Sequence, residues 1–158
     1  MQRTARIAIA TGVLAIAGGG IGPGGSAKAQ GSGYQCSDAT IRGTYGIQMQ
    51  GTQPVPPPQG GGTQTVIGVV VRTYHGDGTF SQVDNIKGSI TGIVPDRPGS
   101  GTYQVYSDCS AVTLFQPGPG ITIEERMVIV DHGSEIRSIV SSPVAVMVST
   151  VQKRIDHR

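Results

Sequence analysis

Residues 64–87 read QTVIGVVVRTYHGDGTFSQVDNIK, and this stretch decides the fold class. Its first part is rich in Val, Ile, Thr and Tyr, residue types that favour β-strands. Residues 75–78 (HGDG) follow, and Asp-Gly supplies the positive φ angles that a tight hairpin turn needs. Residues 79–87 then have the composition of a return strand. The stretch therefore predicts an antiparallel β-hairpin.

Strand patterns continue on both sides of this hairpin. Residues 41–50 alternate between apolar and polar, and a second hairpin is expected from residues 121–130 and 135–141 around a turn at 131–134. Further short strands are expected at 89–94, 101–108, 111–116 and 144–151, with Pro- and Gly-rich loops at 52–63, 95–100 and 117–120. About eight or nine strands joined mainly by hairpin turns predict an all-β chain with a single antiparallel up-and-down β-barrel of about eight strands. A two-sheet β-sandwich is the alternative.

The first 29 residues have the layout of a secretory signal peptide. Arg3 and Arg6 precede an apolar run at 7–17, and the segment closes with AKA at 27–29. The apolar run is shorter than the roughly 20 residues that a membrane-spanning helix needs. We therefore expect cleavage after Ala29, no transmembrane anchor in the mature chain, and export. The pattern leaves the periplasm and the cell exterior open.

Loss of the signal segment changes the charge of the chain. The full sequence has 12 Lys and Arg against 10 Asp and Glu, and Arg3, Arg6 and Lys28 leave with the segment. The mature chain therefore carries 12 minus 3 basic residues against 10 acidic ones, a net charge of −1. Nucleic-acid-binding domains carry clustered positive charge, so we predict no nucleic-acid partner.

Cys36 and Cys109 are the two cysteines of the chain. An even number of cysteines in an exported protein favours a disulfide. Neither residue has a CxxC partner or a nearby His, which argues against a reactive thiol or a metal ligand. We expect the disulfide to hold the N-terminal segment to a barrel domain at 36–151, with a flexible start at 30–35 and a charged tail at 152–158. We predict no metal, no cofactor and no catalytic residue.

Four segments resemble a group of small exported bacterial proteins that have no established function. They are residues 36–46 (CSDATIRGTYG), 75–84 (HGDGTFSQVD), 101–110 (GTYQVYSDCS) and 127–139 (MVIVDHGSEIRSI). That group is similar to β-barrels of the allene oxide cyclase and calycin (lipocalin-like) kind. The resemblance implies a small antiparallel barrel that could hold an apolar small molecule. It implies no cyclase activity, because the catalytic residues of the plant enzymes do not map onto this chain.

Alternate residues of each strand should face the barrel lumen, and this gives a set of candidate ligand-binding residues. The expected apolar walls are Ile47, Met49, Val69, Phe80, Val105 and Phe115, and the expected rings with a polar tip are Tyr45 and Tyr103. Asp84 and Arg137 are the charged members of the candidate set.

Asp84 is the carboxylate of most interest. It shares one strand face with Phe80 and Ile86, and a carboxylate that faces inward needs a partner such as Arg72, Arg137 or a tyrosine hydroxyl. Asp84 is therefore either a structural ion pair or a polar anchor of a ligand cavity. By contrast, Glu124 and Arg126 lie two residues apart on one strand face and should form an outward ion pair.

Three functions fit these patterns. The first is a binding module that takes up a small apolar ligand in its lumen. The second is a structural or interaction protein of the cell envelope or exterior. The third is a cyclase- or isomerase-like enzyme that uses Asp84 in the barrel cavity, although the sequence shows no identifiable reaction and favours a non-enzyme. A filled lumen favours the second function, and an apolar cavity favours the first. The sequence leaves the oligomeric state open.

Overall fold

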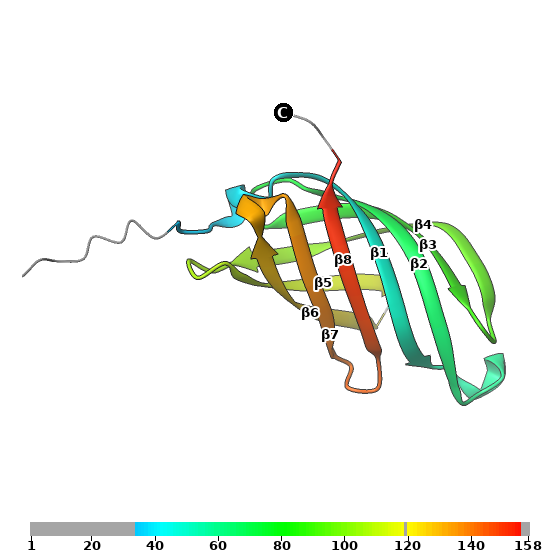
Figure 1. Cartoon of the computed structure of the whole chain (residues 1–158). Coiled ribbons are helices and arrows are strands. Elements are labelled where there is room, and N and C mark those ends of the chain that lie inside the picture. Colours follow the sequence, from blue (N-terminus) through cyan, green and yellow to red (C-terminus); the bar gives the residue numbers. More distant parts are fainter. Residues whose placement is uncertain (1–33, 119, 156–158) are drawn as a thin grey trace, which may run out of the picture. The chain divides into compact units, whose positions relative to one another are not determined.

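The structure, a computed structural model, describes residues 34–118 and 120–155. Eight antiparallel strands close into an up-and-down barrel, in which each strand pairs with its sequence neighbours and β8 pairs with β1 (Figure 1). The strands are β1 (Gly43–Pro54), β2 (Thr63–Tyr74), β3 (Thr79–Gly88), β4 (Gly92–Val105), β5 (Ser110–Gly118), β6 (Ile121–Val130), β7 (Glu135–Ser142) and β8 (Met147–Arg154). The predicted barrel is confirmed, and the sandwich alternative is wrong. The predicted signal peptide lies outside the described residues.

The hairpin of β2 and β3 forms as the sequence predicts. The two strands pair continuously from Tyr74 opposite Phe80 to Val66 opposite Gly88. In the turn, Gly76 and Gly78 have φ angles of 87° and 85°, a region that glycine adopts without steric cost. The Asp77 carboxylate accepts a hydrogen bond of 2.9 Å from the backbone N–H of Thr79, which fixes the turn.

The expected loop at 95–100 is wrong, because β4 runs through both of its prolines. Within the described residues, β4 pairs with β5 only from Ser100 to Val105. The earlier half of β4 is therefore a free edge, where the missing N–H of proline breaks no ladder on that side. Pro95 lies in a bulge, since the pairing with β3 shifts between Asp84 and Ile86.

Two other boundaries also differ from the sequence expectation. The expected loop at 52–63 shortens to 55–62, because β1 continues to Pro54 and β2 begins at Thr63. The expected tail at 152–158 begins later, because β8 continues to Arg154. Gln152 pairs with Ile47 of β1 and has no exposed surface. A polar residue near the end of the chain thus belongs to the barrel core.

A disulfide and a short helix cover one end of the barrel. Cys36 is bonded to Cys109, 73 residues away, as predicted. The 3-10 helix η1 (Asp38–Ile41) follows, and Ile41 is fully buried in the hydrophobic core. The Asp38 carboxylate accepts a 2.7 Å hydrogen bond from the backbone N–H of Val105 on β4. Cys36 and Ile41 therefore belong to the barrel core, and the residues between them are exposed or half-buried.

Arg154 joins the elements that meet at this end. Its guanidinium donates hydrogen bonds to the carbonyl of Thr40 in η1 (3.0 Å), to the carbonyl of Gly133 in the 3-10 helix η3 (Asp131–Gly133) at 3.1 Å, and to the hydroxyl of Tyr45 on β1 (2.7 Å). The third 3-10 helix, η2 (Pro57–Gln59), lies in the loop between β1 and β2.

Two glycines on the inward face of β4 make room for phenyl rings. A Cβ on Gly101 would lie 2.6 Å from Cζ of Phe80 and would overlap the carbonyl of Leu114, and a Cβ on Gly99 would overlap the ring of Phe115. The two rings lie 6.4 Å apart. Close approach to the backbone of β4 is what lets both phenylalanines fit inside the barrel.

Candidate functional site

An ion pair crosses the lumen of the barrel. Arg72 on β2 and Glu125 on β6 lie four strands apart in a closed barrel of eight, on opposite walls. Their side chains meet at 2.9 Å and are only 4% and 8% exposed. Two side chains that touch across a barrel occupy the space that a ligand in the lumen would need.

Neighbouring side chains complete a buried polar network around this pair. Arg72 donates to the Gln82 side-chain carbonyl (2.8 Å) and to the Tyr74 hydroxyl (3.1 Å), and Thr113 donates to Glu125 (3.0 Å). Among the described residues, no buried side-chain nitrogen or oxygen lacks a hydrogen-bond partner. A fully satisfied network of this kind is a rigid part of a core.

The network holds the Arg72 guanidinium in its charged state. Burial alone lowers the pKa of the Arg72 guanidinium, but the attraction of Glu125 and the hydrogen bonds outweigh this, and the pKa is raised above its ordinary value. The guanidinium also lies 4.5 Å from the centre of the Phe80 ring, a cation–π contact.

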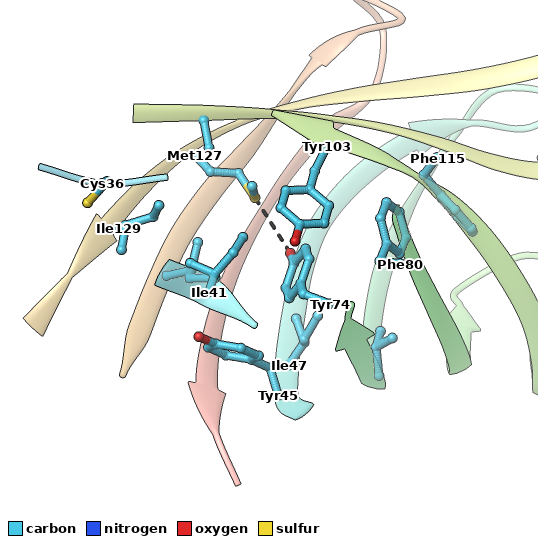
Figure 2. Packing of buried hydrophobic residues seen from close by; sticks show 13 residues of the cluster. Cys36, Ile41, Tyr45, Ile47, Tyr74, Phe80, Tyr103, Phe115, Met127 and Ile129 are labelled. Carbon is cyan, nitrogen blue, oxygen red and sulfur yellow. Dashed lines mark hydrogen bonds between the residues drawn. The ribbon is translucent and has the colours of Figure 1, made fainter. Parts of the chain in front are cut away.

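A layer of aromatic rings lies next to the ion pair, on the side of η1. Tyr74 is at its centre, with ring-centre distances of 5.5 Å to Tyr45, 5.0 Å to Tyr103 and 5.8 Å to Phe80. Figure 2 shows the Tyr74 hydroxyl directed toward the sulfur of Met127 on β6, at 3.7 Å. The hydroxyl also donates to the Gln152 side chain at 2.9 Å. Side chains of β2 and β6 therefore meet across the lumen in this aromatic layer as well as at the ion pair.

The structure brings most of the predicted lumen residues together. Buried inside the barrel are Tyr45, Ile47, Phe80, Asp84, Tyr103 and Phe115, and Met49 and Val105 are partly buried against the same core. These side chains, however, pack against one another and against the polar network.

Two of the predicted lumen residues are on the outside, and these predictions are wrong. Val69 is 60% exposed on the outer face of β2, because the inward face of that strand carries Val66, Val70 and Arg72. Arg137 is on the outer face of β7, where it pairs with Glu135 at 2.8 Å. The run VIGVVV is apolar on both faces, so its composition did not show which residues face inward.

Asp84 is held in a structural ion pair. Its carboxylate accepts two hydrogen bonds from Arg97, at 2.9 and 3.1 Å, and one from the Gln82 amide at 3.1 Å. Neither Arg72 nor Arg137 is its partner. Arg97 was missed because the prolines around it predicted a loop. With three donors on the carboxylate, both oxygens of Asp84 are bound within the barrel wall.

On β6 the structure confirms one expectation and adds one core residue. The outward ion pair of Glu124 with Arg126 is confirmed, with a distance of 2.9 Å. Glu125 was missed as a core residue, although its alternation with Ile123 and Met127 on one strand face was the signal that could have found it.

A groove lies on the outside of the barrel. It has a volume of about 630 Å³, runs across β8, β1, β2 and β3, and continues into a second groove of about 400 Å³. We call its apolar surface the outer β2 face and define it by Ile67, Val69, Val71, Val83 and Val151, each 43–60% exposed.

Comparison with known proteins adds no relative, since no protein-family model, no curated protein and no solved structure matches the chain. In the part of the chain that the structure describes, no three His, Cys, Asp or Glu side chains gather as a metal site requires. None of the described helices is long and apolar enough to cross a membrane.

The buried phenol of Tyr74 makes the stability of the barrel fall at alkaline pH. Burial raises the pKa of Tyr74, and the nearby Arg72 only partly opposes this. A folded-state pKa above the unfolded value of about 10 gives stability that is complete below pH 10 or so and is lost as the pH rises further. We expect the free energy of unfolding in urea to fall above this pH, with a smaller slope in Tyr74→Phe. Tyr106→Phe, at an exposed position, should keep the original slope, and an unchanged slope in Tyr74→Phe would contradict the assignment.

Proposed function

We propose that this protein is an exported, non-enzymatic interaction module that binds a partner through the outer face of its barrel, while the lumen serves as a structural core. The observation that carries the proposal is the Arg72–Glu125 ion pair across the lumen. A buried charge that loses its partner costs several kcal/mol, so a ligand that separates this pair would have to supply that energy.

The interior offers little for enzyme chemistry. Asp84 is bound by Arg97 and Gln82, Glu125 is bound by Arg72 and Thr113, and the raised pKa of Tyr74 keeps its phenol protonated. General acid–base catalysis needs a group that can exchange a proton with a substrate near the working pH. We therefore assign no catalytic role to Asp84.

The exposed side chains of the outer β2 face support the proposed role as an interaction module. Val69 and Val71 are more than half exposed and lie side by side with Val83 of the neighbouring strand. Contiguous apolar surface on a soluble domain marks a binding surface more often than isolated exposed residues do. We therefore place the partner on this face.

Export is part of the proposal. The Cys36–Cys109 disulfide is compatible with an oxidising compartment, and the signal-peptide layout of residues 1–29 gives the route. The resemblance to small exported barrel proteins stays a prediction, as does the choice between periplasm and cell exterior.

Native mass spectrometry of the secreted protein tests this proposal. We expect the mass of residues 30–158 with one disulfide and no bound small molecule. A panel of fatty acids and terpenoids should produce no shift of the melting temperature that Val70→Ala removes. Two neighbouring residues give a matched control, because Val69 faces outward and Val70 faces inward. A ligand whose binding is lost in Val70→Ala and kept in Val69→Ala would overturn the proposal.

A further inference from the structure

We infer that the outer β2 face docks a second copy of this chain in a two-fold arrangement; this inference rests on the proposed function and names the partner. β2 is apolar on both of its faces, a pattern typical of strands that are covered on both sides. In the single chain only the inner face is covered, and Ile67, Val69 and Val71 are each more than half exposed.

The order of residues across the face matches itself about a two-fold axis that runs between the two copies, parallel to β2. Such an axis lays β1 of one copy over β3 of the other, and β8 over β4. In one row of the sheet, Gly46 on β1 pairs with Val71 on β2, and Val71 pairs with Val83 on β3. Gly46 of each copy therefore lies opposite Val83 of the other. Gly46 lines the groove, and the Ile155 side chain of the same copy lies against it, 3.4 Å from where a Cβ would be.

The next row places two amides opposite each other. Gln48 on β1 pairs with Val69, and Val69 pairs with Asn85 on β3. The same axis lays Gln48 of one copy over Asn85 of the other. The Asn85 side-chain carbonyl already accepts a hydrogen bond of 3.1 Å from the backbone N–H of Asp96, so it is the Asn85 NH2 group that can donate to the side-chain carbonyl of Gln48.

The charges at the two sides of the groove also match. Lys153 on β8 and Asp96 on β4 both line it, on opposite sides of β2. Asp96 is exposed and forms no ion pair with any described residue, and Lys153 makes one exposed contact of 3.4 Å with Glu135. Lys153 lies in the row of Gly46, and Asp96 lies beside Asn85 in the next row. The two-fold axis therefore brings Lys153 of one copy one row away from Asp96 of the other, and it does so twice. Opposite charges that flank an apolar centre favour one orientation of docking.

A second copy fits these features better than an apolar small molecule does. A small molecule would cover the valines but would give the Gln48 amide and the Asp96 carboxylate no new partner, and it would leave Lys153 with its exposed contact to Glu135. A second copy covers the valines, and it also pairs amide with amide and cation with anion. Two aligned β-sheet faces pack in this way at the centre of a β-sandwich.

Sedimentation velocity over a range of concentrations tests the inference. The secreted wild-type protein should reach twice its monomer mass, and Val69→Lys should raise the dissociation constant by about 100-fold or more, because it buries a lysine at the centre of the interface. Val128→Lys is the matched control. Val128 is 54% exposed against 60% for Val69, and it lies on β6, across the barrel from β2. This variant should dimerise like the wild type.

A charge exchange tests the orientation. Asp96→Lys and Lys153→Asp should each weaken dimerisation by about tenfold, and the double variant should recover most of the loss, because each copy again meets an opposite charge. A protein that stays monomeric at every concentration overturns the inference, as does a dimer that Val69→Lys leaves intact. Neither result bears on the lumen, so failure of the proposed function is recognised separately, by a ligand that Val70→Ala releases.

Discussion

Arg72→Met should lower the free energy of unfolding by about 3–5 kcal/mol. The substitution removes the Arg72 guanidinium from the Glu125 carboxylate. The carboxylate stays inside the barrel, where the Thr113 hydroxyl still donates a hydrogen bond to it. An anion buried without its cation is among the most costly defects that one substitution creates. Urea denaturation at neutral pH measures the loss.

Two further variants separate the buried pair from a general effect of removing an arginine. Arg72→Met combined with Glu125→Leu removes both charges and should recover most of the lost stability. Arg126→Met removes the exposed ion pair with Glu124 and should cost no more than about 1 kcal/mol. If Arg72→Met costs as little as Arg126→Met, the pair does not form the buried link across the lumen.

Replacing both cysteines with serine should lower the free energy of unfolding by about 4 kcal/mol. Cys36 and Cys109 are 73 residues apart, and a crosslink between distant residues restricts the unfolded chain strongly. Chemical denaturation of the oxidised protein and of the double variant gives the difference.

The barrel itself should persist in the double variant at low temperature. The eight strands do not depend on the disulfide for closure, and Asp38 and Arg154 also hold the covered end. Hydrogen exchange should therefore rise first in residues 36–41 and only weakly in β1 to β8. Equal stability of the oxidised protein and the variant would contradict this role, and so would loss of the whole fold.

The sequence predicts the architecture well because its strand signals are local. Asp-Gly at 77–78 and the alternating residues on either side determine the first hairpin, and the turn at 131–134 determines the second. Such signals depend on neighbouring residues alone, and up-and-down connectivity then leaves closure as the way to remove exposed edges. The disulfide follows in the same way from the two cysteines.

The interior is less predictable because its contacts join distant strands. The partner of Asp84 lies beyond a bulge, and the partner of Arg72 lies on the opposite wall, 53 residues along the chain. The residues next to Asp84 and Arg72 in the sequence do not specify either partner. Val69 was misplaced because both faces of β2 are apolar, and Gln152 was placed in a tail because polar residues rarely mark a core.

A methyl-labelled NMR titration with the apolar dye anilinonaphthalene sulfonate, under conditions where the chain is monomeric, tests the central claim most directly. The methyl groups of Ile67, Val69, Val71 and Val83 report on the outer β2 face, and those of Ile47, Val66, Val70 and Ile136 report on the interior. We predict shifts at the outer group and none at the inner group. Shifts at the inner methyl groups with none outside would contradict a filled lumen and place the binding site within it.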